Sequence, residues 1–273
     1  RKDPQCQIRL GARLRPFLLR RTKGQVALDL PPRTEEDVLC KMEGEQDSLY
    51  QAEVKRIQET LLNVKNDEDF NRARFTVLQG LTRLRQICCH PGLFERAYME
   101  DESAKFTALF YLLDQLKEEG HKVLVFSQFV SMLEIIRERL VEEDRPYTML
   151  TGQTRDRQKV IEEFQTSNDP TVFLLSLKAG GSGLNLTAAS YVVLYDPWWN
   201  PAVENQAIDR THRIGQQNKV IAYRLLMRDS VEEKIRILQK QKEATATGVL
   251  GEEGFAKTLT RDDLSFLFET AAG

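Results

Sequence analysis

The fold of this protein is decided by residues 171–177, which read TVFLLSL and form an almost wholly apolar run. Residues 178–183, KAGGSG, follow directly as a glycine-rich loop. An apolar run without polar alternation indicates a strand buried on both faces, as in parallel sheets. Ligands of such sheets bind beyond the carboxyl ends of the strands, so this loop is a candidate phosphate site. The alternative is a plain turn.

Four further apolar runs follow Ser103, separated by segments that can form helices. They are Lys122–Phe126, Pro146–Leu150, Tyr191–Asp196 and Lys219–Leu226. Buried strands joined by helical crossovers predict an α/β fold, a three-layer parallel sheet flanked by helices. The first such helix is predicted to begin at Ser103 and to stop at Gly120. Its core stripe is predicted to be Phe106, Leu109, Phe110, Leu113 and Leu116.

The part of the chain before Ser103 has a different pattern. Residues 46–64 and 72–88 have the periodicity of two amphipathic helices, which Pro91-Gly92 would end, so we expect a helical protrusion. Residues 1–23 hold eight basic side chains and one acidic one, a balance of +7 that could track a phosphate backbone. An exposed basic helix is the alternative. The charged opening without an initiating Met predicts a fragment of a longer protein.

Bulk composition excludes few functions. The 273 residues are 41% hydrophobic and 29% charged, which does not favour disorder. The net charge of −2 gives no whole-chain argument for nucleic acid. The four cysteines form no CxxC pair, so we expect buried thiols in a reducing compartment and no metal. No apolar run approaches membrane-spanning length and no secretion signal is recognisable, which predicts an intracellular protein.

Gln206, Arg210 and Arg213 are spaced four and three residues apart, which would place them on one face of a helix. Asn200 followed by proline is a candidate N-cap, and Gly215 is a candidate stop. Two convergent guanidiniums need an anion, and an arginine delivered to a transferring phosphoryl group stabilises its charge. The alternative is a solvated face with surface ion pairs. The stripe predicted to pack this helix against the rest of the protein is Val203, Ala207, Thr211 and Ile214.

Two other loops are candidates for nucleic-acid contact. The tandem tryptophans Trp198 and Trp199 follow a predicted strand, and an exposed indole there could stack on a base or enter a groove. Burial of both rings is the alternative. Thr151-Gly152 ends another strand, where backbone amides could meet a phosphate.

In their order and spacing, these blocks closely resemble the C-terminal RecA-like lobe of SWI/SNF-type DNA-dependent ATPases, in helicase superfamily two. The blocks are KVLVFSQF at 122–129, Thr151-Gly152, the glycine loop, WWNP at 198–201 and DRTHRIGQ at 209–216. Residues 14–23, 84–91 and 229–235 resemble the junction between lobes, the end of the protrusion and the start of a brace helix. The resemblance implies a junction at 1–40, a protrusion at 41–95, the RecA-like lobe at 96–228, and a brace helix with tail at 229–273.

The resemblance also implies roles for single residues. Arg210 and Arg213 match the arginine fingers that reach the γ-phosphate of ATP, and Gln206 belongs to the same motif. Nucleotide-binding positions are Gly181, Gly183 and Asn185. DNA-binding positions are Gln128, Thr151, Gly152, Ser176, Lys178 and Trp199. Thr211 stands where the family usually has Ala, a small departure on the packed stripe.

The implied protein is an ATP-driven double-stranded DNA translocase, a helicase-like hydrolase of the cytoplasm or nucleoid in a prokaryote, or of the nucleus in a eukaryote. ATP and Mg²⁺ would be held mainly by an N-terminal RecA-like lobe of the same protein, with no membrane partner. No glycine in this chain is followed by Lys, so the GxxxxGK[ST] cradle is missing, and so is the acidic Asp-Glu motif. The chain alone should not hydrolyse ATP. A non-catalytic DNA-binding module and an unrelated self-sufficient nucleotide enzyme remain as alternatives.

Overall fold

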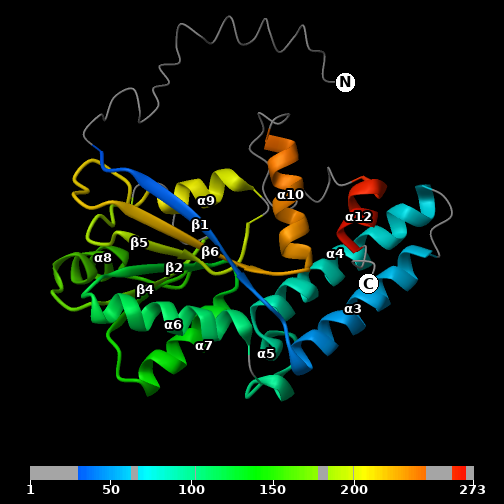
Figure 1. Ribbon diagram of the computed structural model, residues 1–273, viewed down its shortest axis with the longest axis horizontal. Helices are drawn as coiled ribbons and strands as arrows, with labels where there is room; N and C mark the ends of the chain where they lie inside the picture. Colours follow the sequence, from blue (N-terminus) through cyan, green and yellow to red (C-terminus); the bar gives the residue numbers. More distant parts are fainter. Residues whose placement is uncertain are drawn as a thin grey trace, which may run out of the picture.

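A computed structural model describes residues 30–62, 67–101, 103–177, 184–198, 200–243 and 260–268. Its centre is a six-stranded, wholly parallel sheet in the order β1-β6-β5-β2-β4-β3 (Figure 1). The strands are β1 (Arg33–Cys40), β2 (Val123–Ser127), β3 (Tyr147–Leu150), β4 (Val172–Ser176), β5 (Tyr191–Leu194) and β6 (Val220–Met227). Each of the five predicted apolar runs overlaps one of these strands, which confirms the predicted sheet.

The sixth strand, β1, was not expected, because the sequence predicts only a junction between residues 1 and 40. Five polar or charged residues open this strand, so neither apolar alternation nor an apolar run marks it. It pairs with β6 from Arg33 opposite Val220 to Cys40 opposite Met227. A charged edge strand of this kind is recognised only once its partner is known.

Helices cover both faces of the sheet, which gives the predicted three layers. Helices α6 (Ala104–Glu118) and α7 (Val130–Glu142) pack one apolar cluster against β2, β4 and β5. Helices α8 (Arg157–Thr166) and α9 (Pro201–Ile208) pack a second cluster against the opposite face. The predicted stripe of α6 is confirmed. Ser103 stands at the N-cap position, but its hydroxyl donates to the Cys89 carbonyl at 2.8 Å and makes no cap hydrogen bond.

The predicted protrusion consists of α3 (Gly44–Leu62) and α4 (Asp67–Cys89), which lie side by side and extend past the end of the sheet (Figure 1). The short helix α5 (Pro91–Phe94) and the 3₁₀ turn η2 (Arg96–Tyr98) follow. Helices α10 (Val231–Glu243) and α12 (Arg261–Phe268) complete a third apolar cluster with α3 and α4. Phe75 of α4 is 69% exposed, although its spacing from Leu78 and Leu81 is that of an apolar stripe.

None of the helices built from described residues combines the length and apolar content that crossing a membrane requires. The thiols of Cys40, Cys88 and Cys89 are buried, as predicted. Cys6 lies outside the described residues, and so does the basic segment 1–23.

Candidate functional site

The parallel sheet brings several predicted site residues to one edge, because all strands point the same way. Gln128 follows β2, Thr151 and Gly152 follow β3, and Ser176 is the last residue of β4. Asp196 follows β5 by two residues. The carboxyl edge of the sheet is therefore the place where ligands of this fold class would be expected to bind.

Asp196 organises the centre of this edge, and the sequence analysis gave it no role. Its carboxylate accepts from the Ser127 hydroxyl at 2.5 Å and from the Gln128 backbone N–H at 3.3 Å. The side chain is fully buried, and burial raises the pKa of Asp196 above its ordinary value, although the nearby Arg85 opposes the shift. The signal that could have identified Asp196 is an aspartate at the carboxyl end of a buried strand.

Some polar groups of the loop after β3 are hydrogen-bonded to one another. The Thr151 N–H donates to the Thr154 hydroxyl at 3.0 Å, and the Thr151 hydroxyl accepts from the Gln153 N–H at 3.3 Å. Helix α8 begins only at Arg157 and is capped by Asp156. The Thr151 amide is thus engaged within the loop. Gly152 is exposed, and a Cβ added there would meet no atom within 4 Å.

Helix α9 begins as predicted and ends early. The Asn200 side chain accepts from the Ala202 N–H at 2.9 Å, which confirms the N-cap. The helix ends at Ile208, and residues 209–215, here called the arginine turn, close at Gly215 with φ +102°. The single helix running to residue 214 is therefore wrong, and Arg210 and Arg213 do not share a helix face with Gln206.

Hydrogen bonds of Thr211 shape the arginine turn. The Thr211 hydroxyl donates to the Ile208 carbonyl at 2.8 Å, and the Arg213 N–H donates to the Thr211 carbonyl at 3.0 Å. Thr211 is buried, as the predicted stripe requires, but Ile214 is 83% exposed and does not belong to it. Gln206 is exposed on α9.

The arginine turn is fastened to the segment that follows the glycine loop. The Leu186 N–H donates to the Arg210 carbonyl at 3.0 Å, and Arg213 Nη1 donates to the Leu184 carbonyl at 3.2 Å. Gln216, a residue that sequence reasoning missed, donates from Nε2 to the carbonyls of Thr187, Ala189 and Thr211. Residues 184–189 and residues 210–216 are thus joined by hydrogen bonds, although they are about thirty residues apart in sequence.

Arg210 is buried in this part of the protein. It is 6% exposed, and its guanidinium carbon lies 5.6 Å from the centre of the Phe126 ring. Burial and the positive charge of Arg213 together lower the pKa of Arg210 to about 10. A cation that is both poorly hydrated and close to a second cation favours an anionic ligand, because the anion relieves both costs.

The remaining predicted residues divide into two groups. Asn185 is exposed, and its backbone carbonyl accepts from Gln165 Nε2 at 3.1 Å. Trp198 is buried, so the burial alternative holds for that ring, and its backbone N–H donates to the Glu204 carboxylate at 2.8 Å. Four predicted residues lie outside the described part of the chain: Lys178, Gly181, Gly183 and Trp199.

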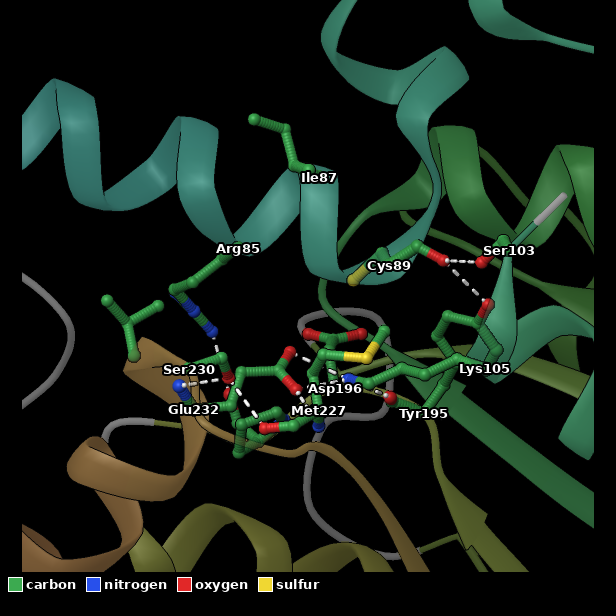
Figure 2. Close-up of polar contacts among 12 residues, drawn as sticks. Arg85, Ile87, Cys89, Ser103, Lys105, Tyr195, Asp196, Met227, Ser230 and Glu232 are labelled. Carbon is green, nitrogen blue, oxygen red and sulfur yellow. Dashed lines mark hydrogen bonds and ion pairs between the residues drawn. The ribbon is translucent and has the colours of Figure 1, made fainter. Parts of the chain in front are cut away.

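A separate polar cluster lies where α4, α6 and α10 meet the sheet (Figure 2). Lys105 Nζ lies 2.6 Å from a carboxylate oxygen of Glu232, and both side chains are fully buried. Lys105 also donates to the Tyr195 carbonyl at 3.1 Å, and Glu232 accepts from the Met227 N–H at 2.8 Å. Burial alone would lower the pKa of Lys105, but the Glu232 carboxylate outweighs it and raises that pKa. The pair joins α10 to the lobe.

The described residues include no group of three or more His, Cys, Asp or Glu side chains placed to hold a metal ion. The arginine turn brings two guanidinium groups, those of Arg210 and Arg213, to one place.

Two family models match the chain. The Helicase conserved C-terminal domain matches residues 104–215, and the SNF2-related domain matches residues 1–93. The yeast ISWI chromatin-remodeling complex ATPase ISW1 (Saccharomyces cerevisiae) is 40% identical over 81% of this chain and 20% of its own length. The chain spans only 20% to 28% of the length of the curated relatives considered.

Solved structures agree with these matches. The Sulfolobus solfataricus SWI2/SNF2 ATPase core in complex with dsDNA has a TM-score of 0.74 and 30% identity, covering 99% of this chain and 58% of that one. The C-terminal domain of the S. solfataricus SWI2/SNF2 ATPase has a TM-score of 0.71 and 29% identity, covering 88% of this chain and 100% of that one. These likenesses confirm the predicted RecA-like fold.

Proposed function

Because the chain belongs to the SWI/SNF-type ATPases of helicase superfamily two, we propose that it supplies the C-terminal RecA-like lobe of an ATP-driven motor that moves along double-stranded DNA. The observation that carries the proposal is the arginine turn, which the structure fastens to the segment behind the glycine loop. This arrangement joins the two cations to the segment that follows, in sequence, a loop whose composition suits phosphate.

Arg210 and Arg213 are proposed to meet the γ-phosphate of ATP bound on an N-terminal lobe of the same protein. Their mutual repulsion and the burial of Arg210 are relieved when an anion arrives. A planar guanidinium matches phosphate oxygens with paired donors, and fixed donors stabilise the charge of the transferring group. Gln206, on the exposed face of α9, is proposed to act beside them.

Nucleotide and metal are assigned mainly to the other lobe. Bound ATP would supply the phosphoryl group, and Mg²⁺ would neutralise its charge. From this chain, the proposed nucleotide-facing residues are Gly181, Gly183 and Asn185. The sequence holds no GxxxxGK[ST] cradle, and the described residues hold no group placed to bind a metal ion.

Double-stranded DNA is proposed to lie along the carboxyl edge of the sheet. The residues proposed to contact it are Gln128, Thr151, Gly152, Ser176, Lys178 and Trp199. Most of them offer hydroxyl, amide or backbone groups, which suit phosphate and sugar contacts rather than base reading. Binding should therefore depend weakly on sequence, and the phosphates that Lys178 and the basic segment 1–23 would neutralise should make it depend on salt. Support comes from the S. solfataricus core, which was solved with dsDNA.

The isolated chain of residues 1–273 is expected to show no ATP hydrolysis, whereas the full-length protein hydrolyses ATP faster when duplex DNA is added. Phosphoryl transfer depends on positioning by both lobes, and arginines without a nucleotide cradle have nothing to act on. Phosphate release measured for both proteins, with and without duplex DNA, tests this.

Each contrary result has a definite meaning. Turnover by the isolated chain would make it an enzyme in its own right and overturn the proposal. A full-length protein that binds duplex DNA but never hydrolyses ATP would instead be a DNA-binding module that has kept the fold.

A further inference from the structure

The arginine turn has a second set of anchors, on the side where the chain enters the sheet. His212 Nε2 lies 2.8 Å from the backbone carbonyl oxygen of Pro31. A carbonyl oxygen only accepts, so Nε2 carries the proton and donates it. His212 immediately precedes Arg213, and this contact therefore fixes the turn next to one of its two arginines.

Arg33, the first residue of β1, provides the other anchor. Its Nη1 lies 3.4 Å from Asp209 Oδ1, and its Nη2 donates to Asn205 Oδ1 at 2.6 Å. Asp209 immediately precedes Arg210. The two anchored residues, Asp209 and His212, each immediately precede one of the two arginines. Both are bound to the same short stretch, residues 31–33.

That stretch is held rigidly in turn. Arg33 pairs with Glu35 at 2.5 Å, and Glu35 also pairs with Arg224 of β6 at 3.1 Å. Arg224 is buried and reaches Asp37 of β1 at 2.5 Å and Glu204 of α9 at 3.0 Å. Burial alone would raise the pKa of Glu35, but Arg33 and Arg224 outweigh it and hold the pKa below its ordinary value. The anchors therefore lead back to β1, β6 and α9.

We propose that His212 and Arg33 are positioning residues for phosphoryl transfer, holding the arginine turn against the strand by which the chain enters this lobe. The inference rests on the proposed function. The turn lies beyond the last residue of α9, and residues 184–189 hold it on one side. The contacts with residues 31–33 fix it on the other side. A misplacement of about 1 Å can lower a rate by about 100-fold. Loss of one anchor should therefore lower kcat and leave nucleotide binding largely intact.

The test uses the full-length protein, with kcat and KM for ATP measured at saturating duplex DNA. His212→Phe keeps the size of the ring and removes the donor, and we expect kcat to fall by about 10-fold with KM changed less than about 2-fold. His212→Gln can place an amide N–H near the position of Nε2, and it should recover most of the lost turnover. Arg33→Met, which removes the second anchor from a different element, should reproduce the loss.

His121 offers a matched control, because it is a partly exposed histidine paired with Glu119 and remote in sequence from the turn. His121→Phe should leave kcat unchanged. Wild-type kcat in both His212→Phe and Arg33→Met, equal loss in His212→Phe and His212→Gln, or a rise in KM without a fall in kcat would each overturn the inference. Retained turnover in Arg213→Ala would contradict the proposed function itself. Failure of the positioning role and failure of the proposed function therefore give different results.

Discussion

Arg213→Ala in the full-length protein is expected to lower the kcat of DNA-stimulated ATP hydrolysis by about 1,000-fold or more, the size of effect known for arginine fingers. The guanidinium is anchored to the carbonyl of Leu184 at 3.2 Å, the residue that follows the glycine loop in sequence. Alanine removes the charge and the paired donors together. Binding of duplex DNA should persist, because the proposed DNA contacts lie on other loops. Steady-state phosphate release and a DNA-binding titration on the same preparation measure both.

Arg213 gives a cleaner test than Arg210. Arg210 packs over Phe126 and is almost fully buried, so its truncation also removes packing and lowers stability. Arg213→Lys keeps the charge but loses the planar fork, and it should recover little turnover. Arg228→Ala is the matched control, because the Arg228 side chain is 63% exposed and pairs with the adjacent Asp229. Near-normal turnover in a folded Arg213→Ala protein would remove the finger from the mechanism.

Lys105→Met should lower the free energy of unfolding of the chain by about 3 to 5 kcal/mol, the usual cost of leaving one partner of a buried ion pair alone. The Glu232 carboxylate is fully buried. The Lys105 ammonium group, 2.6 Å away, balances its charge. Methionine fills a similar volume without a charge. A domain is typically stable by only about 5 to 15 kcal/mol, so this loss is large. Urea unfolding followed by circular dichroism measures it.

Two further variants separate the buried charge from other causes. In Lys105→Met with Glu232→Gln, no charge remains buried and the amide oxygen can still accept from the Met227 N–H, so much of the stability should return. Lys159→Met breaks an exposed pair with Glu163 and should change stability by less than about 1 kcal/mol. If the double variant were as unstable as Lys105→Met alone, lost packing and not the unpaired carboxylate would be the cause.

Much of the fold could be predicted because its signals are local. An apolar run within residues 172–176 indicates the strand there, and apolar residues at helical spacing indicate the buried stripe of α6. The N-cap at Asn200 is equally local. The early end of α9 could not be predicted this way, because Arg210 and Arg213 keep helical spacing whether or not the helix continues. Beyond Ile208 the chain is held by contacts with another loop, such as the bond from Gln216 to the Ala189 carbonyl, and helical spacing carries no sign of them.

The sequence by itself determined the three-layer sheet, the helical protrusion and the family to which the motifs point. Only the tertiary structure showed β1, the Lys105–Glu232 pair and the anchors of the arginine turn. The physical reason is separation along the chain: Lys105 and Glu232 are 127 residues apart, and Pro31 and His212 are 181 apart. Periodicity reports how a segment meets an apolar interior, but it carries no information about which distant polar group will be its partner.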